Sequence, residues 1–174
     1  MIDEGIEVLF LNPVDWELVR PALAACKEAG VVVINIDTVV KDREYVTSII
    51  ETDNYLAGVL CAQDMMKRVD EANIVVIDCP WQASISNRVR GFMDTLDGND
   101  RYRVVYTGTG HGEFEVSAKV MQEVMEEGVS FNVVLGGNDP TALGALATLQ
   151  QYRREEGVLI YGIDGSPDFK AMLK

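Results

Sequence analysis

Five polar side chains stand where a short apolar run ends or where a helix is expected to begin, and their types suggest one kind of chemistry. They are Asn12, Asp37, Arg88, Asn138 and Asp164. Amides, carboxylates and a guanidinium that meet in one crevice can exchange paired hydrogen bonds with vicinal hydroxyl groups. This combination therefore predicts a ligand-binding site for a neutral polyol, on which the protein performs no reaction.

Two aromatic residues near predicted turns are secondary candidates for the same site. Trp81 and Phe114 could each stack on a sugar ring through C–H contacts. An aromatic residue at a helix start is at least as often part of the local apolar packing. Both interpretations stay open, and the two residues rank below the polar set.

The sequence offers little for catalysis, for a metal site or for a cofactor. His111 is the single histidine and lies in a glycine-rich turn, and Ser84 and Ser86 have no evident base beside them. No histidine or cysteine cluster has the spacing of metal ligands. Segment 108–112 lacks the later glycine of a dinucleotide-binding fingerprint and the Gly-Lys of a phosphate loop. We therefore predict no enzyme activity, no metal and no cofactor.

Composition excludes some partners. The chain of 174 residues carries 28 Asp and Glu against 15 Lys and Arg, for a net charge of -13, so a nucleic acid is a poor partner. Cys26, Cys61 and Cys79 are each set among apolar residues and are expected to be buried thiols. The chain as given shows no apolar run long enough to span a membrane and no export signal.

The elements that would position these residues alternate between apolar runs and amphipathic segments. Residues 133–135 stop at two glycines, and a helix begins near Pro140, with Asp139 suited to cap its N-terminus. Predicted strands cover 5–11, 31–36, 73–78, 103–106, 133–135 and 158–163, and predicted helices cover 16–29, 53–69, 84–96, 113–127 and segments starting at 140 and 167. Four strand–helix pairs after Thr52 predict an α/β fold with a doubly wound parallel sheet.

The N-terminal part reads differently. Strand 5–11 has the continuous apolar character of a parallel strand buried on both faces, and helix 16–29 would direct Leu18 inward. Two strands alone cannot cover their own sheet. We therefore assign residues 1–40 to a partial N-terminal lobe, 41–52 to a crossover between lobes, and 53–174 to a C-terminal lobe.

Six motifs in order resemble those of the type I periplasmic sugar-binding proteins, above all the ribose-binding proteins of ABC transporters. The effector domains of LacI-type repressors share the pattern. The motifs are Leu11-Asn12-Pro13-Val14-Asp15, Asn35-Ile36-Asp37, Thr52-Asp53-Asn54 with Ala57-Gly58, Ser84-x-x-x-Arg88-x-x-Gly91-Phe92, Asn138-Asp139-Pro140 with Ala142-Leu143-Gly144-Ala145, and Gly162-Ile163-Asp164-Gly165-Ser166-Pro167-Asp168.

The resemblance implies a monosaccharide, ribose-like, clasped between two lobes that close by a hinge motion, and a closed form that an ABC transporter permease recognises. Asn12 and Asp37 would come from one lobe, and Arg88, Asn138 and Asp164 from the other. Such relatives are periplasmic or extracellular. The alternative is an effector-sensing domain of a LacI-type transcription regulator or sensor, although the chain has no helix-turn-helix and no basic face of its own.

Departures from the family pattern bear on the ligand and on assembly. Thr38 stands where ribose binders tend to carry an arginine, and Gly112 where an aromatic residue often stacks. The resemblance describes a truncated chain with an almost complete C-terminal lobe, so we expect weak or absent sugar binding by the monomer. A second copy, by simple association or domain swapping, is expected to cover the sheet around 5–11 and 31–36. In a full-length version, Arg88→Ala and Asp164→Ala should abolish binding without unfolding.

Overall fold

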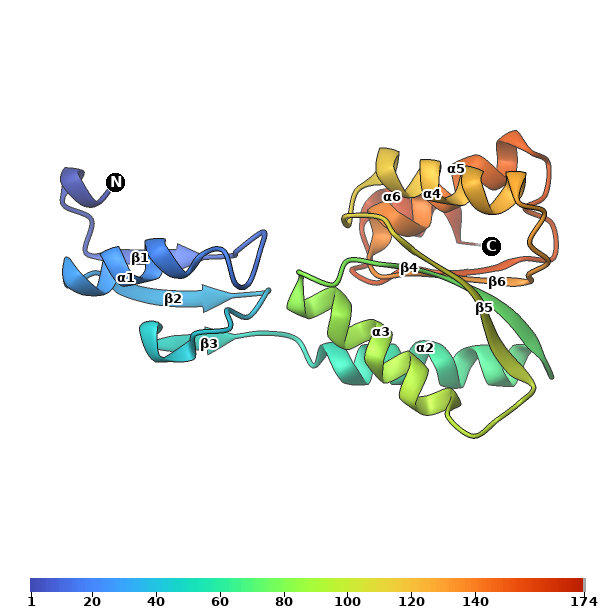
Figure 1. Cartoon of the computed structure of the whole chain (residues 1–174), viewed down its shortest axis with the longest axis horizontal. Coiled ribbons are helices and arrows are strands. Elements are labelled where there is room, and N and C mark those ends of the chain that lie inside the picture. The colour runs from blue at the N-terminus through green and yellow to red at the C-terminus, as the bar shows by residue number, and fades with distance from the viewer. Residues whose placement is uncertain (174) are drawn as a thin grey trace. The chain divides into compact units, whose positions relative to one another are not determined.

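The computed structural model describes residues 1–173 and shows an α/β protein with two parallel sheets (Figure 1). The chain divides into two compact units. The first comprises Met1–Asn54 with Trp81–Ser84, and the second comprises Tyr55–Pro80 with Ile85–Lys174. No helix among residues 1–173 is both long and apolar enough to cross a membrane.

The first unit is a three-stranded parallel sheet in the order β1-β2-β3, with one helix packed on it. The strands are β1 (Val8–Leu11), β2 (Val32–Ile36) and β3 (Ser48–Ile50), the helix is α1 (Arg20–Glu28), and the short 3-10 turns are η1 (Ile2–Glu4) and η2 (Arg43–Tyr45). Leu23 and Cys26 of α1 pack on Val33 of β2 to form a small core. Because β3 pairs with β2, part of the predicted crossover 41–52 lies within this sheet.

The opposite face of this sheet is apolar and uncovered. We call it the uncovered face; it is formed by Val8, Phe10, Val32, Ile34, Ile36 and Ile50. Side chains alternate between faces along a strand, and α1 covers only the side that carries Leu9 and Val33. Phe10 is 64% exposed, so the prediction that strand 5–11 is buried on both faces was wrong.

The first helix also begins later than predicted. The Asp15 carboxylate accepts the backbone N–H groups of Glu17 and Leu18, both at 2.8 Å, which holds a turn where the helix was expected. Helix α1 then starts at Arg20. Leu18 consequently lies outside the helix and is 79% exposed, which corrects its predicted inward orientation.

The second unit is a doubly wound parallel sheet, as predicted (Figure 1). Its strands are β4 (Ala72–Asp78), β5 (Tyr102–Thr109), β6 (Val133–Gly136) and β7 (Leu159–Tyr161), in the order β5-β4-β6-β7. The helices are α2 (Asn54–Arg68), α3 (Ala83–Leu96), α4 (Phe114–Glu126), α5 (Asp139–Gln151) and α6 (Pro167–Met172). Helices α2 and α3 cover one face, and α4 and α5 cover the other.

The central strand and the helix pair α2–α3 are closely packed. Residues 74–77 of β4 are at most 1% exposed, because both faces of the sheet are covered. Helices α2 and α3 approach each other at Gly58 and Gly91, where an added Cβ would overlap backbone atoms of the facing helix.

The chain passes from β5 across β4 to β6, so the strand order reverses between β4 and β6. In such sheets, ligands bind at the carboxyl ends of the strands beside that reversal.

Candidate functional site

Three consecutive residues at the junction of β6 and α5 each hold a different segment of the second unit. Asn138 is the N-cap of α5: its Oδ1 accepts the Thr141 N–H at 3.0 Å, and its Nδ2 donates to the Gly112 carbonyl at 3.0 Å. The sequence had suggested Asp139 for the cap. Asp139 is instead the first helical residue, because Asn138 has the extended backbone that an N-cap requires.

Arg88 reaches this junction from α3. Its Nη1 donates to the Gly137 carbonyl at 3.0 Å and lies 3.1 Å from Asp164 Oδ1. Arg88 is only 6% exposed, so it is a buried residue and not the open crevice residue that we expected. A buried guanidinium needs acceptors on several sides, and the carbonyl and the carboxylate provide them.

Asp164 follows β7 in a turn with unusual backbone angles. Its φ is 141°, a region that residues with a side chain rarely adopt, and Gly165 has φ 72°. The side chain is 43% exposed. Burial raises the pKa of the Asp164 carboxyl above its ordinary value, while the charge of Arg88 lowers it and that of Asp139 raises it further. Arg88, Asp164 and residues 137–138 thus meet in one place.

Asn12 and Asp37 lie together in the first unit. Asn12 Nδ2 donates to Asp37 Oδ2 at 2.9 Å, and Asn12 Oδ1 accepts the Thr38 N–H at 3.3 Å. Both side chains are exposed, and Asp37 has a left-handed backbone with φ 64°. The Thr38 side chain is buried, and its hydroxyl lies 3.1 Å from the Ser84 hydroxyl. Thr38 therefore has a packing role at the position of the expected arginine.

Sequence reasoning missed the residue that supports this pair. Asn35 is fully buried, and its side-chain amide donates to the carbonyls of Leu11 and Thr38 and accepts the Val40 N–H. These bonds join the ends of β1 and β2 to the loop that follows. The available signal was an asparagine inside an otherwise apolar strand, where an unbonded amide would be costly.

Asp78 at the carboxyl end of β4 was also missed. Its Oδ1 accepts the Cys79 N–H at 2.6 Å. Burial raises the pKa of this carboxyl, and the Cys79 bond opposes the rise. Its signal was a carboxylate that closes the apolar run 74–77, beside the reversal point of the sheet.

The two aromatic candidates fall in different units. Trp81 is half-buried, and its carbonyl accepts the Trp16 N–H at 3.2 Å within the first unit. Phe114 is the first residue of α4, and its ring is partly exposed. Stacking on a ligand stays a prediction for both residues.

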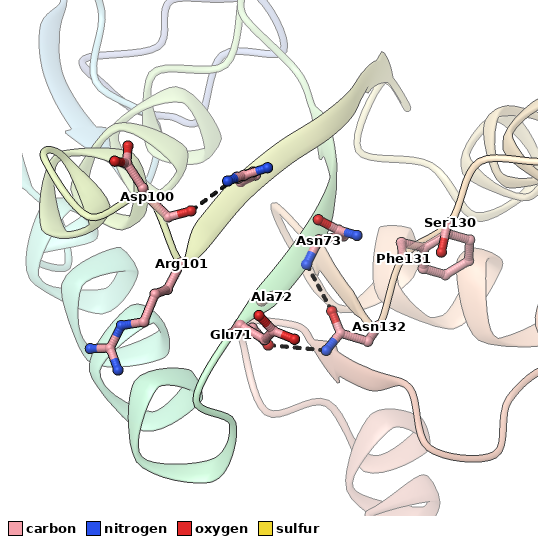
Figure 2. A pocket seen from close by; sticks show the side chains of 9 residues that line it. Glu71, Ala72, Asn73, Asp100, Arg101, Ser130, Phe131 and Asn132 are labelled. Carbon is pink, nitrogen blue, oxygen red and sulfur yellow. Dashed lines mark hydrogen bonds between the residues drawn. The ribbon is translucent and has the colours of Figure 1, made fainter.

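A polar cavity of about 400 Å³ lies at the amino ends of β4 and β5, opposite to the predicted site. Figure 2 shows Asn132 bridging two backbone segments there: Nδ2 donates to the Glu71 carbonyl at 3.2 Å, and Oδ1 accepts the Asn73 N–H at 2.8 Å. Arg103 Nε donates to the Asp100 carbonyl at 2.9 Å. These side chains tie strand starts together, so we assign the cavity no ligand.

A second cavity, of about 540 Å³, runs along β7 and α6. It is lined by Gly165, the neighbour of Asp164, but not by Arg88, Asn138 or Asp164. Within residues 1–173, no group of three His, Cys, Asp or Glu side chains is placed to hold a metal ion. The candidate site of the second unit therefore consists of hydrogen-bonding groups at the carboxyl end of its sheet.

Comparison with known proteins identifies one family. The family model of the periplasmic binding protein domain matches residues 1–174. The chain is 28% identical over 182 residues to a D-ribose/D-allose-binding protein of Pseudomonas aeruginosa, covering 100% of this chain and 56% of the relative. It is 29% identical over 167 residues to the ribose import binding protein RbsB of Escherichia coli, covering 94% and 55%.

A solved structure agrees with these sequence relatives. An ABC transporter solute binding protein from Agrobacterium vitis with bound D-fucose matches with a TM-score of 0.89 and 25% identity, covering 98% of this chain and 60% of that one. The chain thus spans about half the length of the curated relatives it matches.

Proposed function

The chain belongs to the periplasmic binding protein domain family, and from this premise we propose that it binds a monosaccharide, ribose-like, as part of an ABC sugar transporter. The relatives are binding proteins and not enzymes, in agreement with the prediction that no reaction is performed. The permease as a partner and a periplasmic or extracellular location belong to the same proposal.

One observation carries the proposal: Arg88 bonds both Asp164 and the carbonyl of Gly137, the chain neighbour of Asn138, beside the reversal point of the second sheet. Asp164 Oδ1 lies against Arg88, and the carboxylate is 43% exposed, so it can accept further hydrogen bonds from the solvent side. Asn138 donates one amide hydrogen to Gly112 and has a second. A carboxylate acceptor and an amide donor of this kind are the groups that bind sugar hydroxyls.

The exposed Asn12–Asp37 pair of the first unit is a second polyol-binding element by the same chemistry. We propose this role separately from that of Arg88 and Asp164. The Asn12 amide and the Asp37 carboxylate already bond each other, so they would have to share these bonds with a ligand. Since both sets already make intramolecular hydrogen bonds, we expect affinity in the millimolar range, about -4 kcal/mol.

The test is saturation-transfer NMR on the 174-residue chain with D-ribose, D-allose and 2-deoxy-D-ribose. D-ribose and D-allose should give saturable signals, and 2-deoxy-D-ribose a weaker one, because it lacks the 2-hydroxyl and so offers fewer vicinal hydroxyl pairs. Asp164→Asn should reduce the signal, and Asp168→Asn, an exposed carboxylate on α6, should not. Equal signals from all three sugars would contradict recognition of vicinal hydroxyls.

We also propose that a second copy of the chain packs on the uncovered face. Two parallel sheets with the same apolar patch can pack face to face in an isologous dimer. Phe10→Ser should shift the light-scattering mass toward a monomer, and Leu18→Ser should not, because Leu18 is also exposed but lies outside the sheet. A wild-type chain that stays monomeric at millimolar concentration would refute this association.

A further inference from the structure

Asp139 is a buried carboxylate whose backbone N–H and side chain both bond to the turn that carries Asp164. It is 1% exposed. Its backbone N–H donates to the Ile163 carbonyl at 3.0 Å, and its Oδ2 accepts the Ser166 N–H at 2.6 Å. The two bonds therefore hold the turn 163–166 at both ends, with Asp164 and Gly165 between them.

The turn needs such a restraint. Asp164 has φ 141° and Gly165 has φ 72°, and a residue with a side chain keeps an unfavourable backbone conformation only where its surroundings determine it. The short bond to Ser166 involves a charged acceptor, which makes it stronger than a bond between neutral groups. Asp139 is also the first residue of α5, where the helix dipole favours a negative charge.

The surroundings of Asp139 leave its carboxylate little freedom. A Cβ added to Gly162 would lie 2.9 Å from Asp139 Oδ1, so the glycine leaves room for this oxygen. Among the residues that the structure describes, Oδ1 has no hydrogen-bond partner. A buried carboxylate with one unsatisfied oxygen, close to the like charge of Asp164, is unfavourable by itself. The geometry that the Asp139 carboxylate imposes on the turn compensates for this cost.

We propose that Asp139 is a positioning residue for ligand binding, which holds the turn 163–166 so that Asp164 faces Arg88. The inference rests on the proposed sugar-binding function, in which Asp164 contacts the ligand. Asp139 itself is too deeply buried for ligand contact. Its effect is exerted through the 3.1 Å pair of Asp164 and Arg88.

The first experiment needs no ligand. NMR of the unliganded chain follows the Ser166 amide and the guanidinium signals of Arg88. Asp139→Ala should move the Ser166 amide and shorten the lifetime of the Arg88 guanidinium protons, because the turn relaxes and Asp164 withdraws. Asp139→Ser, whose hydroxyl suits a helix start but is too short to reach Ser166, gives the same test if the alanine variant does not fold. Unchanged Arg88 signals would overturn the proposal.

The second experiment measures D-ribose affinity in a double-mutant cycle. Asp139→Ala should weaken binding by about tenfold in the wild type and by less than about twofold in the Asp164→Asn background, since the effect passes through Asp164. Asp139→Asn retains an acceptor for Ser166 and should restore most of the affinity. Glu155→Ala, which removes another carboxylate with an unpaired buried oxygen, is the matched control and should change neither readout. Equal losses in both backgrounds would overturn the proposal.

Failure of the proposed function would look different. If the wild-type chain binds no sugar, the function is refuted, while the NMR comparison still decides whether Asp139 positions Asp164 against Arg88.

Discussion

Replacing Gly58 by alanine should destabilise the second unit, although alanine is the better helix former. A Cβ at Gly58 would lie 2.8 Å from both Arg88 C and Phe92 N of α3 and closer still to the Arg88 carbonyl oxygen, against ordinary contacts of 3.4 Å or more. The helices would have to separate by at least 0.6 Å, the difference between 3.4 and 2.8 Å, and the displaced atoms are backbone.

The magnitude follows from two opposing effects. In a helix interior, alanine is favoured over glycine by about 1 kcal/mol. Overpacking of a close contact costs about 1–3 kcal/mol and occasionally more, and a backbone obstacle belongs at the upper end. We expect a net loss of about 2 kcal/mol in the free energy of unfolding, which for a chain of this size lowers Tm by roughly 4–8 °C.

Thermal unfolding followed by circular dichroism and calorimetry measures this loss. Gln63→Ala, on the exposed side of the same helix, is the control and should stay within about 0.5 kcal/mol of the wild type. A Gly58→Ala variant that is as stable as the wild type, or more stable, would show that helix propensity outweighs the contact. The proposed close packing of α2 on α3 at Arg88 would then be refuted.

Three further changes test separate features. Asp78→Asn should raise the free energy of unfolding more at pH 7 than at pH 3. Burial raises the folded-state pKa of Asp78, so the stability that the neutral carboxyl contributes is present below the unfolded pKa and is lost as the carboxyl ionises at higher pH. Equal gains in denaturant titrations at both pH values would contradict this. Asn138→Ala should cost about 0.5–2 kcal/mol for the lost cap, and Asn138→Asp less, as chemical unfolding would show. Burial and the nearby Asp64 raise the pKa of the Cys61 thiol to about 11. Cys61 should therefore react with a disulfide reagent at pH 8 far more slowly than a peptide thiol. A fast reaction phase that disappears in Cys61→Ala would refute this.

Much of the fold was predictable, because parallel strands and amphipathic helices carry strong periodic patterns. The strand 73–78 became β4 (Ala72–Asp78), and the helix 84–96 became α3 (Ala83–Leu96). The first unit was harder. Whether an apolar strand is covered on one face or two depends on what packs against it, and the sequence of 5–11 is the same in either case.

The candidate site shows the same division. Asp164 was predictable as a polar residue near a strand end and Arg88 as one near a helix start. Their pairing was not predictable, since a contact between residues so far apart depends on the backbone of 163–166. The roles of Asn138 and Asp139 were exchanged for a similar reason: both side chains can cap a helix, and only the backbone angles decide which one does. Asn35 was overlooked because its neighbours in β2 are apolar and its partners lie in other segments.

The junction at 137–139 also limits how the chain can change in length. Since a helix advances about 100° per residue, one inserted residue would turn the start of α5 and remove the anchors of α3, of the loop at Gly112 and of the turn at Asp164 together. The exposed connection 152–157, which ends α5 and precedes β7, carries none of these anchors. Insertions and deletions should therefore be tolerated in that connection and excluded from the junction.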